Sequence, residues 1–136
     1  MGIYVYFVFN GQTKEALALY KEAFQTDEAI VKRFNEIEGY EKFVPEGYGS
    51  HIMHAEVDIL GTKVMFSDSL PGQEHHVGNH ITVAVVTDNE QQLQFAFDVL
   101  ARDGEIIMHL QATDWSKSYG SLRDRFGVEW QFNLEG

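Results

Sequence analysis

Hydrophobic and polar positions alternate along the opening segment of the chain, in the two-residue period of a strand. After a short turn sequence the period lengthens to the three-to-four-residue spacing of an amphipathic helix, which begins at Thr13 as a candidate cap and ends near Phe24. Alternation then returns, and Leu60 with Gly61 predicts a tight turn between two strands. The apolar stripe predicted for the helix comprises Ala16, Leu17, Tyr20 and Phe24. Strands are predicted at about residues 3–9, 29–37, 51–59 and 62–67.

The second half repeats this order of elements. A helix is expected to be capped near Asp88 or Asn89 and to end before Gly104. Strands are predicted at about residues 80–87, 105–109, 119–124 and 128–134. Residues recur at identical spacing in the two halves: Asp58, Gly61 and Phe66 in the first, and Asp124, Gly127 and Phe132 in the second.

Two copies of a repeat are too few for a solenoid, which needs three or more stacked units. The pattern therefore predicts an α+β fold of two tandem βαβββ modules within a single domain, residues 1–136. The first module spans about residues 1–69, the linker about 70–79, and the second module about 80–136.

Strand alternation separates each predicted sheet into two faces. One helix in each module cannot cover both faces of a four-stranded sheet, so one face stays open for a cavity or a partner. In residues 51–59 the apolar side expected beneath a helix comprises Met53, Ala55, Val57 and Ile59. The side chains expected on the open faces include Tyr4, Tyr6, His54, Glu56, Met65, His80, Thr82 and Gln131.

Composition narrows the function classes. The chain has no cysteine, which excludes disulfides, thiolate metal ligands and cysteine nucleophiles and fits a reducing cytoplasm. Ten basic residues against 21 acidic ones give a net charge of −11, which disfavours binding to nucleic acid or to an anionic membrane. The opening segment lacks the basic flank and the length of a targeting or membrane-spanning segment. We therefore expect a cytoplasmic protein.

A series of short motifs follows in order along the chain: EALALYKEAF, IMHAE, FSDSLPGQ, GNHI, LQATDWSKSYG and DRFGVEWQF. This series resembles the PhnB-like branch of the vicinal-oxygen-chelate superfamily, which also includes glyoxalase I, bleomycin- and fosfomycin-resistance proteins and extradiol dioxygenases. The resemblance covers nearly the whole chain. It implies curved mixed sheets around a cleft between the modules, with the helices outside, and a homodimer.

In enzymes of this superfamily, four inward residues hold a divalent metal. The resemblance places these positions at Tyr4, Met65, His80 and Gln131. Only His80 is a strong ligand type, because a thioether is too soft for the ions these enzymes use and an amide is a weak donor. We therefore expect no cofactor, with a divalent metal as the alternative.

His80 and Glu56 are the candidate catalytic residues. With His54 they could form a two-histidine, one-carboxylate metal site, although such sets arise easily among six histidines and a polar pair lining a solvated cleft is the simpler interpretation. Trp115 is equally compatible with closing over a ligand and with packing. Asp58 and Asp124 are expected to organise the turns that follow them.

Two functions from different classes follow. The first is metal-independent binding of a small organic molecule, as in the bleomycin-resistance members, and the missing metal ligands favour it. The second is a metal-dependent lyase, isomerase or dioxygenase that uses His80. The residues leave open whether a reaction is catalysed and which ligand is bound. The expected ligand-binding residues are Tyr4, Tyr6, His54, Glu56, Met65, His80, Trp115 and Gln131.

Overall fold

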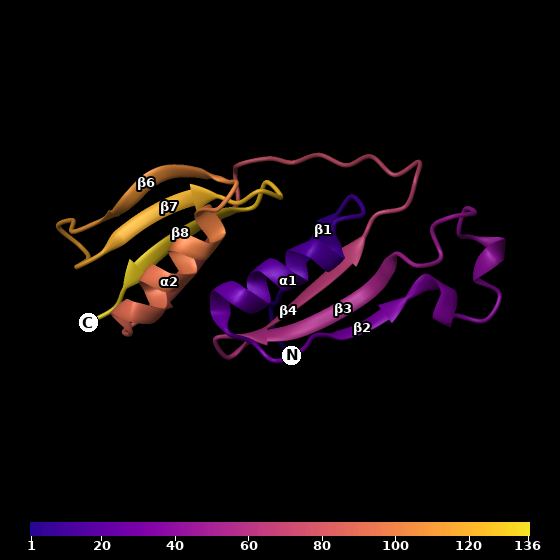
Figure 1. Cartoon of the computed structure of the whole chain (residues 1–136), viewed down its shortest axis with the longest axis horizontal. Helices are drawn as coiled ribbons and strands as arrows, with labels where there is room; N and C mark the ends of the chain where they lie inside the picture. The colour runs from indigo at the N-terminus through magenta and orange to yellow at the C-terminus, as the bar shows by residue number, and fades with distance from the viewer. The chain divides into compact units, whose positions relative to one another are not determined.

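A computed structural model describes residues 1–136 and divides them into two compact units. Unit 1 comprises residues 1–21 and 25–75, and unit 2 comprises residues 22–24 and 76–136. Each unit contains one four-stranded mixed sheet with one helix against it (Figure 1). The predicted α+β fold of two βαβββ modules is therefore confirmed.

Unit 1 is built on a sheet with the strand order β1-β4-β3-β2, in which β1 and β4 are parallel and the other pairs antiparallel. Its elements are β1 (Val5–Phe9), α1 (Thr13–Phe24), β2 (Ile30–Arg33), the short 3₁₀ helices η1 (Phe34–Glu36) and η2 (Tyr40–Lys42), β3 (Ile52–Ile59) and β4 (Thr62–Asp68). Helix α1 lies against one face of this sheet, where the Tyr20 ring packs 5.9 Å from Phe7 and 6.0 Å from Phe66, measured between centroids. The buried stripe of α1 differs from the predicted one at Leu17, which is half-buried, while Leu19 is buried.

The start of α1 corrects one prediction. Thr13 is not a cap, because it lies inside the first turn with its side chain fully buried. Its backbone N–H donates to Oδ1 of Asp68 at 3.0 Å, and Oδ2 of the same carboxylate accepts from the N–H of Ile52 at 2.9 Å. The last strand thus supplies the acceptor that a helix start requires, and it joins α1 to β3.

The strand predicted at residues 29–37 is shorter than expected. It ends at Arg33, where the pairing of β2 with β3 shifts register, and the chain then turns into η1. The Phe34 side chain is buried, and the Glu36 carboxylate accepts from the N–H of Arg33 at 2.6 Å. The backbone N–H groups of Phe34 and Asn35 still donate to the carbonyls of His51 and Gly49, at 3.1 and 2.8 Å, so the regular strand ends at a register shift that alternation alone could not place.

Unit 2 has the equivalent strand order β5-β8-β7-β6, with β5 and β8 parallel. Its elements are β5 (Val83–Thr87), α2 (Glu90–Ala101), β6 (Glu105–Gln111), β7 (Tyr119–Arg123) and β8 (Glu129–Leu134). Asn89 caps α2 as predicted, because its side chain accepts from the N–H of Gln92. Phe97 of α2 packs edge-on against Phe132 at 5.2 Å and covers one face of the sheet.

The repeated aspartates have different roles. Asp124 is buried, and its Oδ1 accepts from the N–H groups of Phe126 and Val128, so it organises the turn as predicted. Asp58 is exposed, and the prediction for it is wrong: the β3–β4 turn rests instead on Leu60 and Gly61, both with positive φ, 50° and 86°. Two left-handed residues in succession form the turn that matches the twist of a hairpin.

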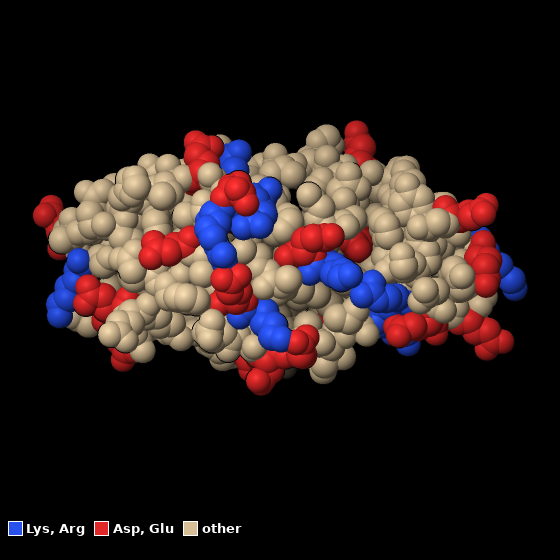
Figure 2. All heavy atoms as spheres, viewed as in Figure 1, with Lys and Arg blue, Asp and Glu red and all other residues tan.

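Charged side chains of both signs lie beside one another on the face drawn in Figure 2, without a continuous basic patch. The ion pairs of the structure include Lys21 with Glu28 and Arg125 with Asp103. Neither helix is long and apolar enough to cross a membrane.

Candidate functional site

The open face of the unit 1 sheet carries a connected set of polar and aromatic side chains. The hydroxyl of Tyr6 on β1 lies 3.3 Å from Nδ1 of His54 on β3, and Nε2 of His54 lies 3.5 Å from a carboxylate oxygen of Glu56. Met65 of β4 pairs with both Tyr6 and Glu56, so its side chain lies between them in the same row. Strand alternation explains this grouping, because these residues occupy equivalent positions on adjacent strands.

Lys63 completes this set, and the sequence interpretation missed it. Its ammonium lies 3.8 Å from the Glu56 carboxylate and 5.7 Å from the centroid of the Tyr4 ring. Strand alternation could have predicted it, because Lys63 precedes Met65 by two positions on one strand and therefore lies on the same face. We call Tyr4, Tyr6, His54, Glu56, Lys63 and Met65 the unit 1 open-face cluster. It can exchange hydrogen bonds with a polar ligand and stack on a planar one.

Two cavities include predicted site residues: one of about 550 Å³ in unit 2, which Trp115 lines, and one of about 280 Å³ in unit 1, which Glu56 lines. The unit 1 cavity includes Glu56 and Lys63 together with Asp27, Glu28 and Asp58. Four carboxylates against one ammonium make it acidic.

On the unit 2 sheet, Gln131 is held on both sides of its amide. Its Nε2 donates to Oγ1 of Thr82 at 2.6 Å, and its Oε1 accepts from the Tyr119 hydroxyl at 3.0 Å. On the same face of adjacent strands, an Arg123 nitrogen lies 3.5 Å from the Glu129 carboxylate. Gln131 is therefore fixed in orientation by its neighbours.

Two predicted site residues lie outside the strands to which the alternation assigned them. His80 is exposed and precedes β5, which begins only at Val83, where pairing with Trp130 of β8 starts. Tyr4 precedes β1 and is half exposed. The prediction that His80 enters a strand is wrong, because the parallel pairing with β8 does not extend to it.

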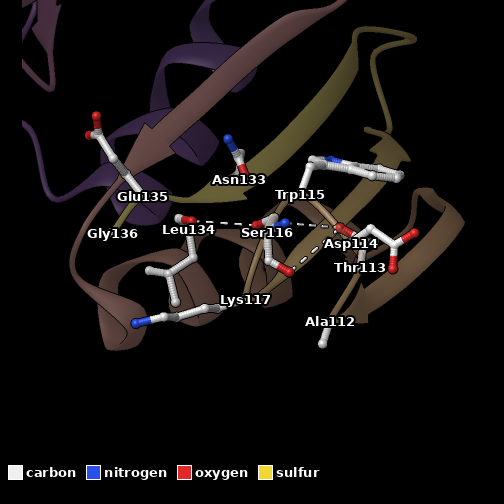
Figure 3. A pocket seen from close by; sticks show the side chains of 10 residues that line it. All are labelled: Ala112, Thr113, Asp114, Trp115, Ser116, Lys117, Asn133, Leu134, Glu135 and Gly136. Atoms are coloured by element: carbon white, nitrogen blue, oxygen red, sulfur yellow. Dashed lines mark hydrogen bonds between the residues drawn. The ribbon is translucent and has the colours of Figure 1, made fainter.

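Trp115 lies in the loop between β6 and β7 with 68% of its surface exposed, and its ring meets Tyr119 edge-on at 5.5 Å. The loop, residues 112–117, and residues 133–136 line the larger cavity (Figure 3). Ser116 anchors the loop, because its hydroxyl donates to the carbonyl of Ser118 at 2.9 Å. Trp115 therefore packs on Tyr119 and also lines a pocket, and its closing over a ligand stays a prediction.

The donor set does not suit the divalent ion that the superfamily implies. No group of three or more His, Asp or Glu side chains in the structure could hold a metal ion. Met65 offers only a thioether, and the Gln131 carbonyl already accepts from Tyr119. The side chains at these positions are therefore poor ligands for such an ion.

Comparison with known proteins identifies relatives over the whole chain. The sequence model of the family described as 3-demethylubiquinone-9 3-methyltransferase matches residues 2–133. Protein YjdN of Escherichia coli K12 is 29% identical, over 95% of this chain and 92% of its own. A PhnB protein from Bacillus cereus is 28% identical with a TM-score of 0.79, over 99% of this chain and 100% of its own. Protein PA1353 from Pseudomonas aeruginosa is 26% identical with a TM-score of 0.83, over 98% and 96% of the two chains.

The fold is also that of a fosfomycin-resistance protein. FosX from Listeria monocytogenes, in a structure that contains Mn(II), has a TM-score of 0.62 over 99% of this chain and 93% of its own, at 9% identity. The resemblance to PhnB-like proteins and the vicinal-oxygen-chelate fold is confirmed.

Proposed function

Because the chain belongs to the 3-demethylubiquinone-9 3-methyltransferase family and has the vicinal-oxygen-chelate fold, we propose that it binds a small organic molecule on the open faces of its sheets, without a catalytic metal. The observation that carries this proposal is the unit 1 open-face cluster. Its links run from Tyr6 through His54 and Glu56 to Lys63 and the Tyr4 ring. In the proposed site on unit 2, Gln131, Trp115 and His80 contact the ligand.

The family description names a methyl transfer, and the structure does not suit the nucleotide cofactor of such a reaction. Neither sheet is doubly wound and parallel, and no Gly-rich loop joins a strand to a helix. The N–H of Thr13 at the start of α1 donates to Asp68, so it is not free for a ligand. We therefore propose binding and not transfer of a methyl group from S-adenosylmethionine.

The chemistry of the cluster favours a neutral or cationic ligand with a planar portion. Tyrosine rings stack on planar groups and attract cations, and the net charge of −11 repels phosphorylated molecules. A hydrogen-bonding group of the ligand would meet His54 or Tyr6. The Glu56 carboxylate is paired with the Lys63 ammonium and lies beside His54, so its negative charge is partly balanced and it can still accept a hydrogen bond from the ligand.

A thermal-shift screen of metabolites and drug-like compounds tests the proposal. Compounds that raise the unfolding temperature are expected to lose most of that effect in the His54→Ala and Tyr6→Phe variants. Phe43→Ala is the control, because Phe43 is also exposed but lies beyond η2 and outside the cluster. Ligands that keep their full effect in both cluster variants, and map elsewhere by chemical-shift perturbation, would remove the site from consideration.

Calorimetry distinguishes the metal-dependent alternative. After dialysis against zinc, nickel, manganese or iron(II), we expect no stoichiometric binding tighter than about micromolar, which corresponds to roughly 8 kcal/mol. Tighter binding that disappears in the His80→Ala variant would overturn the proposal of binding without a metal and would favour the metal-dependent alternative.

A further inference from the structure

We infer that Asn10 is a site of spontaneous covalent modification, at which the backbone nitrogen of Gly11 displaces ammonia from the side-chain amide. Both residues lie in the connection from β1 to α1, outside the unit 1 open-face cluster (Figure 1). Asn10 is also the one asparagine of this chain that is followed by a glycine. Modification there is independent of the ligand binding proposed above.

The structure leaves both reacting groups free. Asn10 and Gly11 are exposed and belong to no helix or strand. Neither the side-chain amide of Asn10 nor the N–H of Gly11 makes a hydrogen bond. Because no hydrogen bond of a helix or sheet has to break, local motion of the turn is enough to bring the Gly11 nitrogen to the amide carbon.

The backbone conformation at position 11 favours glycine strongly. Gly11 has a φ of 81°, in the left-handed region that residues with a Cβ rarely adopt. Glycine also hinders the reaction least, because no side chain shields its backbone nitrogen. The turn therefore places beside Asn10 the residue that lets its amide react most readily.

The reaction consumes one water molecule and releases one ammonia molecule. The Gly11 nitrogen loses its proton and bonds to Cγ of Asn10, the amide nitrogen leaves as ammonia, and a five-membered succinimide ring forms. Water then opens the ring at one of its two carbonyl carbons. Opening at Cγ gives aspartate, and opening at the backbone carbonyl carbon gives isoaspartate, in which the chain continues through Cγ. Each product carries one more negative charge than the −11 of the unmodified chain.

The two products should differ in stability, because the connection is anchored at both ends. The Phe9 carbonyl accepts from the N–H of Ser69 at 2.7 Å, and the Thr13 N–H donates to Asp68 at 3.0 Å. Only residues 10–12 lie between these two anchors at the end of β4. Isoaspartate adds one carbon to this short stretch of backbone. Aspartate only places a negative charge near the start of α1, where the helix dipole favours it.

Peptide mapping by mass spectrometry tests the modification. The full chain is kept folded at body temperature and mildly alkaline pH for two weeks, beside a sample unfolded in guanidinium chloride. The peptide that contains Asn10 should gain about one dalton in both samples, since the exposed connection need not unfold to react. Asn89 is the internal control and should gain nothing in the folded sample, because its side chain accepts from the N–H of Gln92. The Asn10→Gln variant should stay unmodified, because its longer side chain would have to close a larger ring.

An Asn10 peptide without mass gain in the folded protein would overturn the inference, and a gain in guanidinium chloride alone would assign that failure to the fold. Equal mass gain at Asn89 would also count against it, since the site would then not be selective. The isoaspartate form, separated by ion-exchange chromatography, should unfold at a lower urea concentration than the Asn10→Asp variant, which has the same charge. Equal urea midpoints would contradict the constraint on residues 10–12.

Discussion

Asp124 and Asp58 occupy equivalent positions in the two halves but differ in the hydrogen bonds that they accept. The Asp124→Ala substitution removes the acceptor of two backbone N–H groups and of the Trp130 indole, whose Nε1 lies 2.9 Å from Oδ2. We expect a loss of about 3 kcal/mol in the free energy of unfolding, measured by urea denaturation, because buried donors are left unsatisfied. Asp58→Ala is the matched control and should change stability by less than about 0.5 kcal/mol, since Asp58 is exposed. Equal losses would contradict the assigned roles.

Strand alternation predicted the correct face for site residues that lie in regular strands. His54, Glu56 and Met65 could be placed on one face because β3 and β4 pair without interruption. The position of His80 could not be predicted, because the start of β5 depends on how far its pairing with β8 extends.

The β3–β4 turn carries a prediction at the scale of elements. Leu60 adopts φ 50°, a left-handed conformation that costs an L-residue roughly 1–2 kcal/mol and that asparagine tolerates better. Leu60→Asn should raise the free energy of unfolding by about 1 kcal/mol, with the gain read from the urea midpoint. Leu60→Val should lower it, because branching at Cβ disfavours this conformation further. A stability order with valine above asparagine would show that the Leu60 side chain contributes packing that outweighs its backbone conformation.

Both helices and the sequence of strands along the chain were predictable, because each depends on a local period of apolar residues. The end of β2 was not, since it lies where the pairing with β3 shifts register and the chain turns into η1. The acceptor at the start of α1 escaped prediction for a different reason: Asp68, which accepts from the Thr13 N–H, lies far along the chain. Local sequence patterns therefore fail where the end of a helix or strand is set by residues distant in the sequence.

For the whole molecule, the open faces motivate a prediction of self-association. One face of each sheet has no helix over it and exposes apolar side chains, including Tyr6 and Val8 in unit 1 and Val86 in unit 2, each 45–50% exposed. We expect a homodimer, with a mass twice the 15.5 kDa of the chain in light scattering at micromolar concentration. A mass of one chain across that range would contradict it. A Val8→Lys variant should shift the equilibrium toward the monomer, whereas Val77→Lys, at an exposed position outside the strands, should not.

The parallel pairing of β1 with β4 has a consequence for synthesis on the ribosome. Val5 pairs with Val64, so the first strand made is without its neighbour until the last strand of unit 1 has emerged. The same delay applies to Thr13, whose acceptor is Asp68 at the end of β4. At about 5–20 residues per second, the nascent chain therefore spends several seconds with an unpaired, aromatic strand exposed to the cell. Nascent chains arrested before β4 should be cleaved readily by protease within β1, and those arrested after unit 1 has cleared the exit tunnel should resist it.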